Sequence, residues 1–559
     1  MNGSSIKQSI LFSGIFLSLV FAPGVFAATT GDVVTFNVEE RFEASENARV
    51  EAVLVRTSAN LYVYVEKKWW DVQVPAKQGE ILTRVDILTA EFSGNIYPTL
   101  TSVFGSEWKP GVDGDSKITL LFHAMKEGAA GYFRSADEYL KLQVPGSNER
   151  EMLYLALANI ENPQVKNVLA HEFTHLITFN QKDRLRGVTE ETWLDEARAD
   201  YAPTILGYGV KYDGSNLQGR VRDFLANPSD SLTEWQGKKH DYGVASVFTH
   251  YLVDHYGITV LSDSLKLPSV GIASINEVLA KNGYQETFAQ IFTNWTVAAA
   301  INNCSVSLHY CYLSQNLQNL RVSPTLNFLP LTGNSSLSVT NVTKNWAGTW
   351  QKIIGGNGNL TLEFSGLPGV NFKVPYLIFD KENNYTVNFL ALDKNQKGKI
   401  SIADFGQQYS SLIIIPLLQD KTAGFSESEF TYPYTFKATI SGQVTEEDPA
   451  LILQLLQQIE SLKKQIAALQ ALRPGGGGLV LCSEITANLY VGVENPAAVK
   501  CLQQFLKNQG PAIYPEGLVT GNFFSLTRAA AMRFQQKYSI IATGYVGILT
   551  RTKINELLP

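Results

Sequence analysis

Between residues 165 and 180 the chain reads Val-Lys-Asn-Val-Leu-Ala-His-Glu-Phe-Thr-His-Leu-Ile-Thr-Phe-Asn. Apolar residues recur at helical spacing, which predicts a single helix with one buried face. His171 and His175 are four residues apart and share one face of that helix, so both imidazoles can reach one metal ion. Glu172 stands beside them, where it can contact a water molecule on that metal without ligating it. The stretch therefore predicts a zinc site with an adjacent base.

A third ligand is expected from a second element, because catalytic zinc typically has three protein ligands. The segment Trp193-Leu-Asp-Glu-Ala-Arg-Ala-Asp-Tyr201 offers Glu196, which lies 21 residues beyond His175 (196 − 175). Asp200 lies four residues further on and shares a helical face with Glu196. A carboxylate at that position can accept the free ring N–H of a ligating histidine and fix its tautomer.

This combination of motifs resembles the gluzincin zinc peptidases, the thermolysin-like group. The tryptophan-led Trp-Leu-Asp-Glu form is closer to the hyicolysin-like branch. The resemblance spans roughly the first three hundred residues, and its specific motifs cover 165–201 and 240–257. It implies a zincin-type α+β peptidase domain that binds Zn²⁺. The roles it implies are His171, His175 and Glu196 as metal ligands, Glu172 as general base and Asp200 as a partner behind the ligands.

The segment His240-Asp-Tyr-Gly243 precedes a stretch, 244–255, that predicts another helix. It resembles the segment that supplies a tyrosine or histidine to stabilise the developing oxyanion in such enzymes. Tyr242 is the first candidate for that role and His240 the second. The alternative is that Tyr242 simply packs at the start of a helix.

Two other interpretations of the zinc motif stay open at this point. The two histidines and the glutamate could be structural, or the site could bind zinc without turnover. Every expected catalytic position is filled, which favours hydrolysis of peptide bonds by metal-activated water. The histidines without useful partner spacing are assigned to structure: His123, His250, His255 and His309.

The N-terminal residues follow the pattern of an export signal. Lys7 supplies a positive start, an apolar stretch runs from residue 10 to 22, and residues 25–27 suit a signal peptidase. We therefore expect residues 1–27 to be a signal peptide, cleaved after residue 27 or 28, and the protein to be secreted or cell-wall associated. The alternative is an uncleaved membrane anchor.

Composition is that of an ordinary globular protein, with 45% hydrophobic and 18% charged residues among 559. The net charge of −6 gives no reason to expect nucleic acid as a partner. The four cysteines form two local pairs, Cys304 with Cys311 and Cys482 with Cys501, which predicts two disulfides in an oxidising compartment. Four buried free thiols are the alternative.

A chain of this length predicts a multidomain fold. Mixed strand-like and helix-like segments from 31 to 322 predict the α+β peptidase domain, with strands at 61–65 and 117–122. From 323 to 443, short runs rich in Thr, Val and Ile are broken by Gly, Pro and Asn, which predicts a β-sandwich accessory domain.

Within that accessory domain, residues 393–404 resemble a calcium-binding EF-hand loop. Asp393 and Asp404 stand at the first and twelfth positions. Lys397 occupies a position where an oxygen ligand belongs, Asp404 replaces the usual bidentate Glu, and the flanking residues predict strands. The segment is therefore interpreted as a hairpin turn.

Residues 448–472 predict a helical, coiled-coil segment. Between 452 and 469, Ile and Leu alternate at steps of three and four, which favours a parallel pair of helices and hence a homodimer. The alternative is a single helix lying on a neighbouring domain. Residues 473–478 contain four consecutive glycines and are interpreted as a linker.

The last module, residues 479–559, contains an internal repeat. Gly521-Asn-Phe-Phe-Ser-Leu-Thr-Arg528 recurs as Gly544-Tyr-Val-Gly-Ile-Leu-Thr-Arg551. With the segments 499–505 and 533–536, these residues resemble the peptidoglycan-binding type 1 domain, which implies a small α-helical module and peptidoglycan as a partner. A helical bundle that binds another partner is the alternative.

The sequence therefore favours a secreted zinc peptidase that acts on proteins or peptides and is tethered to the cell wall by its C-terminal module. A peptidase that cuts the stem peptides of peptidoglycan is a second interpretation. A non-catalytic adhesin or scaffold is a third, and the glutamate at position 172 argues against it.

Overall fold

The computed structural model describes residues 28–425, 427–441, 484–493 and 495–558. The expected signal peptide, the heptads of 448–472 and the glycine linker lie outside the described residues. The chain divides into two units, residues 1–445 and 446–559, which are described separately below.

The first unit begins with a six-stranded sheet in the order β1-β2-β3-β4-β6-β5. Strands β3, β4 and β6 run parallel, and the other neighbours are antiparallel. Their bounds are β1 Val33–Asn37, β2 Arg49–Thr57, β3 Leu61–Glu66, β4 Ile118–His123, β5 Gly131–Phe133 and β6 Met152–Ala156. The strands predicted at 61–65 and 117–122 correspond to β3 and β4. Every residue of β4 and β6 is buried, as expected for parallel strands covered on both faces.

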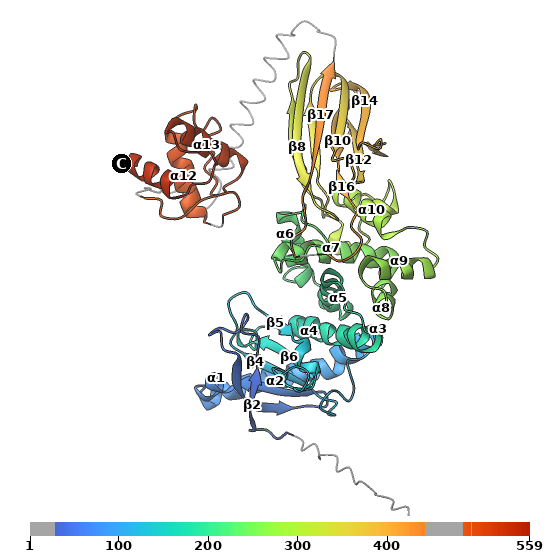
Figure 1. Ribbon diagram of the computed structural model, residues 1–559, viewed down its shortest axis with the longest axis vertical. Coiled ribbons are helices and arrows are strands. Elements are labelled where there is room, and N and C mark those ends of the chain that lie inside the picture. The colour runs from blue at the N-terminus through green and yellow to red at the C-terminus, as the bar shows by residue number, and fades with distance from the viewer. Residues whose placement is uncertain (1–27, 426, 442–483, 494, 559) are drawn as a thin grey trace, which may run out of the picture. The chain divides into compact units, whose positions relative to one another are not determined.

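Helices cover one face of this sheet, and the helix with the two histidines is among them (Figure 1). The bounds are α1 Lys67–Asp71, α2 Pro75–Glu91, α3 Tyr97–Phe104 and α4 Val165–Phe179. The helix predicted over 165–180 is therefore present as α4. Leu169, Phe173 and Leu176 are fully buried along it, because their spacing places them on the face that packs against the sheet.

A group of helices follows α4 in the chain. Their bounds are α5 Thr192–Ile205, α6 Asn216–Ala226, α7 Lys239–Tyr256, α8 Thr259–Leu265, α9 Gly271–Lys281 and α10 Phe288–Ile301. Helix α7 begins five residues before the predicted start at 244, because the Asp241 carboxylate accepts hydrogen bonds from the Lys238 and Gln236 amides and caps its first turn. Gly243 lets α7 approach α6 closely, since a Cβ there would lie 2.5 Å from the Phe224 amide nitrogen.

A nine-stranded sheet occupies residues 325–441. The sheet contains two groups of antiparallel strands. The first has the order β13-β12-β15-β9, and β7 pairs in parallel with β9. The second has the order β14-β10-β17-β8. A single residue pair, Phe405 with Tyr409, joins the two groups. The bounds are β7 Thr325–Leu329, β8 Ser335–Thr343, β9 Gln351–Gly355, β10 Gly358–Gly366, β12 Pro375–Asp380, β13 Tyr385–Phe389, β14 Lys397–Phe405, β15 Tyr409–Ile414 and β17 Tyr432–Ser441. Two short strands pair separately, β11 Phe372–Lys373 and β16 Leu417–Leu418.

The turn at Asp393 is stabilised from within the chain. The Asp393 carboxylate accepts hydrogen bonds from the Asn395 and Lys397 amides, at 2.8 and 3.0 Å. The interpretation of this turn as a hairpin is wrong, because it joins β13 to β14 and these strands are not neighbours in the sheet.

Within the described residues of the second unit there are three helices, α12 Pro496–Asn508, α13 Ser525–Lys537 and α14 Ile548–Leu557. Its two motif copies are held by equivalent glutamines. Gln503 accepts from the Gly521 amide at 2.8 Å and donates to Thr527 Oγ1 at 2.9 Å. Gln535 does the same with Gly544, at 2.8 Å, and with Thr550, at 3.0 Å. Each glycine turn and the threonine in the first turn of the helix that follows are thus fixed by one buried amide.

One predicted disulfide is present, between Cys304 and Cys311. Cys501 is also disulfide-bonded, and Cys482, its expected partner, lies outside the described residues. Among the residues that the structure describes, no helix has both the length and the apolar character needed to span a bilayer.

Candidate metal centre

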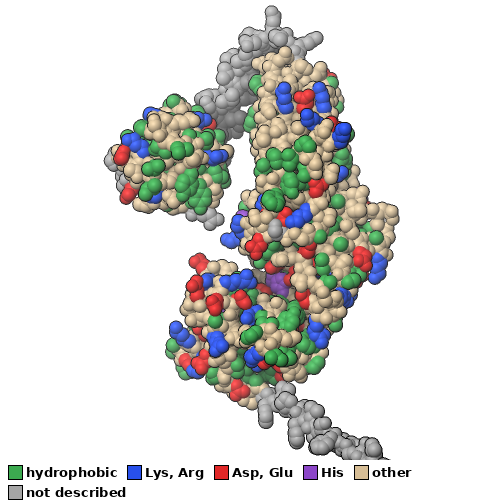
Figure 2. Space-filling model, viewed as in Figure 1, with side chains coloured by type: hydrophobic (Ala, Val, Ile, Leu, Met, Phe, Trp, Pro, Cys, Tyr) green, Lys and Arg blue, Asp and Glu red, His purple; other side chains and the backbone are tan. Residues whose placement is uncertain are grey.

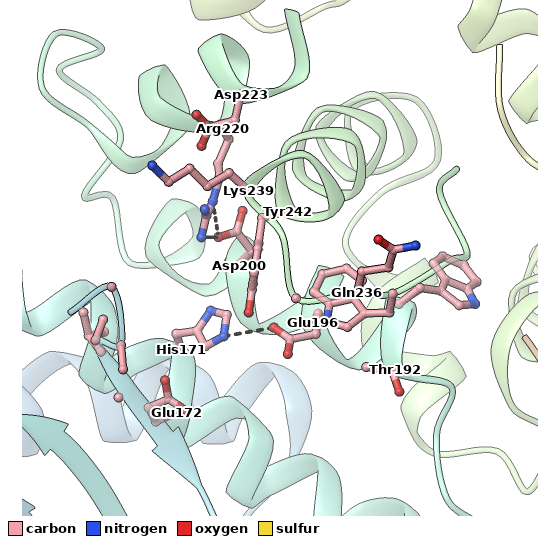
Figure 3. A pocket seen from close by; sticks show the side chains of 18 of the residues that line it. His171, Glu172, Thr192, Glu196, Asp200, Arg220, Asp223, Gln236, Lys239 and Tyr242 are labelled. Carbon is pink, nitrogen blue, oxygen red and sulfur yellow. Dashed lines mark hydrogen bonds and ion pairs between the residues drawn. The ribbon is translucent and has the colours of Figure 1, made fainter. Parts of the chain in front are cut away.

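Helices α4 and α5 bring three potential metal ligands together. His171 Nε2 lies 3.1 Å from His175 Nε2 and 3.2 Å from Glu196 Oε2, and His175 Nε2 lies 3.7 Å from Glu196 Oε2. All three ligand atoms fall within 4.8 Å of one another. Figure 3 shows His171 and Glu196 pointing toward each other from the two helices. The predicted histidine pair and the predicted third residue are therefore adjacent in space.

The donor set fits a zinc ion. Glu196 Oε2 is buried and has no hydrogen-bond donor, although it faces two imidazoles. Two imidazole nitrogens and one carboxylate oxygen are the ligands found in one common class of catalytic zinc site. A divalent cation between them would satisfy all three atoms at once.

Glu172 lies next to this group but outside it. It follows His171 on α4, is only 6% exposed, and lines the same cavity. Burial raises the pKa of its carboxyl above the ordinary value, while the two histidine rings act in the opposite direction. Its oxygens do not join the three converging ligand atoms, so Glu172 lies beside the candidate metal site and is not part of the ligand group.

Asp195 fixes the second histidine, a role that the sequence analysis missed. Its Oδ2 lies 2.9 Å from His175 Nδ1 and accepts the proton on that nitrogen. This tautomer leaves Nε2 with a lone pair for a metal. Burial alone would lower the pKa of His175, but Asp195 and then Glu196 raise it to about 10. The only signal in the sequence was that Asp195 immediately precedes Glu196.

Asp200, predicted to support a ligating histidine, is hydrogen-bonded to other partners. Its Oδ1 accepts from Arg220 Nε at 2.8 Å and from Asn216 Nδ2 at 3.1 Å, while Oδ2 is buried and unpartnered. Burial would raise the pKa of Asp200, but Arg220 and, to a lesser extent, His171 lower it. The carboxylate therefore lies within the electrostatic influence of His171, and its second oxygen can still accept a hydrogen bond.

Tyr242 lies near His171 and lines the same cavity. Its ring is 6.3 Å from the His171 ring and packs edge-on against Trp235, with ring centroids 4.9 Å apart. The Arg220 guanidinium lies 4.5 Å from the ring centroid, so Asp200, Arg220 and Tyr242 form a continuous chain of contacts, visible in Figure 3. Burial raises the pKa of the Tyr242 phenol, which keeps it a hydrogen-bond donor.

A cavity of about 1040 Å³ surrounds these residues. Figure 2 shows histidine side chains at the bottom of the hollow on this face. His240 is not among the lining residues, whereas Lys239 and Tyr242 are. The loop between β16 and β17 also lines the cavity, through Gly424, Phe425 and Glu427. The Gly424 amide donates a hydrogen bond to Glu191 Oε1 at 2.9 Å. No sequence motif indicated that the strand-rich region reaches the metal centre.

Comparison with known proteins finds a metalloprotease relative and a match to one domain family. The chain is 25% identical over 283 residues to the neutral metalloprotease ShpI of Staphylococcus hyicus. The match covers 45% of this chain, and the chain spans 59% of the length of that relative. Residues 495–554 match the family model described as "Putative peptidoglycan binding domain". Both resemblances noted in the sequence are thereby confirmed, to a metallopeptidase and to a peptidoglycan-binding domain.

Two of the solved structures that match the chain each cover about a fifth of it. The pre-peptidase C-terminal domain of a collagenase from Bacillus anthracis is 8% identical, with a TM-score of 0.14, and the match covers 21% of this chain and 96% of that one. The lysozyme inhibitor PliG of Aeromonas hydrophila is 11% identical, with a TM-score of 0.15, covering 21% of this chain and all, 100%, of that one. TM-scores this low support no conclusion about fold or function.

Proposed function

We propose that the protein is a secreted zinc-dependent peptidase that hydrolyses peptide bonds and is tethered to peptidoglycan by its C-terminal module. The observation that carries the proposal is the convergence of His171, His175 and Glu196 beside the buried Glu172, inside a large cavity. The similarity to a neutral metalloprotease supports it. A merely structural histidine pair would need neither the base nor the cavity.

The residues of the centre divide the chemistry among them. His171, His175 and Glu196 would hold the zinc ion, which would supply a Lewis acid that lowers the pKa of water and polarises the scissile carbonyl. Glu172 removes the proton of the attacking water and later delivers it to the leaving amine. Tyr242 donates a hydrogen bond to the developing oxyanion. His240 would need a different side-chain conformation to share that role, since it does not line the cavity.

Two residues orient this machinery. Asp195 holds His175 in the tautomer that presents Nε2 to the metal. Asp200 holds Arg220 against the ring of Tyr242, and His171 lies close enough to lower the pKa of its carboxyl. Both carboxylates are positioning residues, because neither contacts the reacting atoms.

The domain assignments form part of the proposal. Residues 31–322 would be a zincin-type peptidase domain and 323–443 a β-sandwich. Two groups of strands that share one hydrophobic core and meet at a single residue pair support the sandwich. The remaining boundaries, 448–472, 473–478 and 479–559, stay as predicted from the sequence, with a possible homodimer through 452–469.

The test of activity uses the full-length protein and a protein substrate. Casein should be degraded, a zinc chelator should abolish this, and added Zn²⁺ should restore it. Purified cell-wall material should release few new amino termini; preferential cleavage of wall stem peptides would favour the second interpretation. Bound zinc with no turnover of either substrate would favour a non-catalytic adhesin.

The tether is tested separately by sedimentation with peptidoglycan. The 479–559 module alone should pellet with the polymer, and a chain that ends at Arg473 should stay in solution. Equal pelleting of the two proteins would contradict the assignment of peptidoglycan as the partner of this module.

A further inference from the structure

Part of the wall of the cavity comes from the strand-rich region, residues 325–441. Gly424 and Phe425 line the cavity, although they follow β16 and lie far along the chain from the helices that carry the metal ligands. The chemistry proposed above uses neither residue. Residues so placed can act on a substrate only if the strand-rich region is held firmly against those helices.

The strand-rich region and the helices share one hydrophobic core. Trp346, just before β9, is 1% exposed and packs edge-on against Phe288 and Phe292 of α10, with ring centroids 5.1 and 5.4 Å apart. Trp350 Nε1 donates a hydrogen bond to the Thr296 carbonyl of α10 at 2.9 Å. Close-packed side chains leave little room for relative movement, so this core fixes the strand-rich region on the helices.

The segment that leads to the cavity, residues 419–425, is anchored by hydrogen bonds of its backbone. The Asp420 and Lys421 amides both donate to Asn345 Oδ1, at 2.8 and 3.0 Å. Trp346 Nε1 donates to the Lys421 carbonyl at 2.6 Å. Because Trp346 belongs to the shared core, the segment is held to the part of the strand-rich region that contacts the helices.

Glu191 joins the end of this segment to the helix of the third proposed zinc ligand. Its Oε1 accepts from the Gly424 amide and its Oε2 from Trp193 Nε1, each at 2.9 Å. Glu191 directly precedes α5, the helix that carries Glu196. Gly424 has φ +67°, a left-handed conformation that favours glycine. The carboxylate thus holds the backbone next to Phe425 at the start of α5.

Phe425 brings an apolar ring into this wall. The ring packs against the shared core and also lines the cavity, so it is only partly buried. Trp193, which lines the same cavity, lies three residues before Glu196 and on the same face of α5. The Glu191 carboxylate already has two donors. This wall therefore offers a substrate apolar surface.

We propose that Phe425 forms a subsite for an apolar side chain, aromatic or large aliphatic, of the peptide substrate. Glu191 is a positioning residue that holds this subsite against α5. The inference rests on the proposed peptidase function and adds a substrate preference to it. An apolar side chain placed against an aromatic ring is favourable, because both surfaces leave water. The strand-rich region then supplies part of the active site.

The competing explanation is that Phe425 only fills the interface between the strand-rich region and the helices. The two explanations differ in what the loss of the ring changes. Loss of packing alone lowers the stability of the fold and affects every substrate to the same extent. Loss of a subsite lowers the preference for one class of substrate side chain and leaves the other substrates nearly unchanged.

The test uses the full-length, zinc-loaded protein and quenched peptides that differ at one position near the cleaved bond. That position holds phenylalanine, leucine, alanine or aspartate, and each position on both sides of the bond is varied in turn. At one position the wild-type protein should prefer phenylalanine or leucine. There, Phe425→Ala should lower kcat/KM for these two peptides about 10–100-fold, mainly through KM, and change that for the alanine peptide less than about twofold. An equal loss for all four peptides, or an unchanged preference, would overturn the subsite.

Two further variants control for general damage. Phe430→Ala is the matched control, because Phe430 lies in the same connection between β16 and β17, is 81% exposed and is not among the residues that line the cavity. It should leave the preference intact, and a loss equal to that in Phe425→Ala would overturn the assignment. Phe425→Leu keeps an apolar side chain and should retain most of the preference.

The role of Glu191 is tested by combining variants. Glu191→Gln leaves one oxygen to accept from two donors, so it should reduce the preference measured above. In the double variant with Phe425→Ala, the preference should fall no further than in Phe425→Ala alone, because both changes act on one subsite. Additive losses would contradict the positioning role.

Peptide binding separates this inference from the proposed function. Glu172→Gln should bind peptide without cutting it, so labelled peptides can be followed by fluorescence anisotropy. In that background, Phe425→Ala should weaken binding of the phenylalanine peptide about 10–100-fold and that of the alanine peptide much less. Binding with this preference in a protein that cuts no peptide would contradict the peptidase function alone. Cleavage without any apolar preference would overturn the subsite alone, and a protein that neither binds nor cuts peptides would overturn both.

Discussion

Replacing Glu172 by glutamine separates metal binding from catalysis. The side chain is 6% exposed, and its oxygens lie outside the three converging ligand atoms. Glutamine has the same shape and can still hydrogen-bond to water, but it cannot take up a proton. Burial already raises the pKa of the Glu172 carboxyl, so removing the charge should not destabilise the fold. The variant should therefore keep its zinc and its structure.

The expected loss is in the rate of turnover. Removal of a general base typically lowers the rate by about 10²–10⁴-fold. At about 1.4 kcal/mol for each factor of ten, this corresponds to about 3–6 kcal/mol in the barrier. The loss should lie toward the upper end, because the same carboxyl also delivers a proton to the leaving amine.

Glu196→Gln should differ from Glu172→Gln in its zinc binding. In this variant a neutral amide replaces a proposed ligand whose Oε2 lies 3.2 Å from His171 Nε2. Its zinc affinity should fall, and activity should return in part at high zinc concentration. Glu363→Gln, on the exposed side of β10, should change neither quantity. Zinc would be measured by mass spectrometry and turnover with a quenched peptide. A fully active Glu172→Gln, or one that loses zinc while Glu196→Gln retains it, would refute the assigned roles.

Three further predictions concern the surroundings of the site. Asp195→Asn should lower zinc affinity or activity about 10–100-fold, because it weakens the contact of residue 195 with His175. The loss should be larger than in Asp200→Asn. Equal zinc affinities in the wild-type protein and in Asp195→Asn would count against this role of Asp195. Tyr242→Phe should lower kcat about 10²–10³-fold with little change in zinc content, and an unchanged kcat would remove Tyr242 from the mechanism. His123→Gln should flatten the acid dependence of stability. Burial lowers the pKa of His123 to about 4 from an ordinary 6.5, so as pH falls the unfolded chain gains the proton first, and the folded state loses up to about 3 kcal/mol between pH 6.5 and 4. Identical thermal midpoints against pH for wild type and variant would contradict this.

The sequence predicted those parts of the centre that depend on helical spacing alone. His171 and His175 share a face because they are four residues apart on one helix, and any helix there would bring them together. Glu196 could be predicted for a different reason, since a two-histidine zinc site needs a third ligand and the segment after residue 192 is strongly helical. The strands at β3 and β4 were recognisable from their continuous apolar runs.

The parts that could not be predicted depend on how separate elements meet. Asp195 and Asp200 both lie on α5, and their relation to the two histidines depends on the rotation of α5 about its axis. Helical spacing predicted Asp200 as a support, whereas the packing of α5 on α4 places Asp195 against His175. Residue type and spacing do not predict the rotation of α5, because that rotation depends on which side chains of α4 and α5 interdigitate.

The same reasoning applies with greater force to the carboxylates before β4 and β6. Glu107 and Glu151 are 44 residues apart in the chain (151 − 107), and no local pattern connects them. The EF-hand-like turn at 393–404, by contrast, has a local pattern, yet its first aspartate is satisfied by backbone amides of its own turn. Only the fold shows which buried carboxylates lie near one another and which are already satisfied by nearby donors.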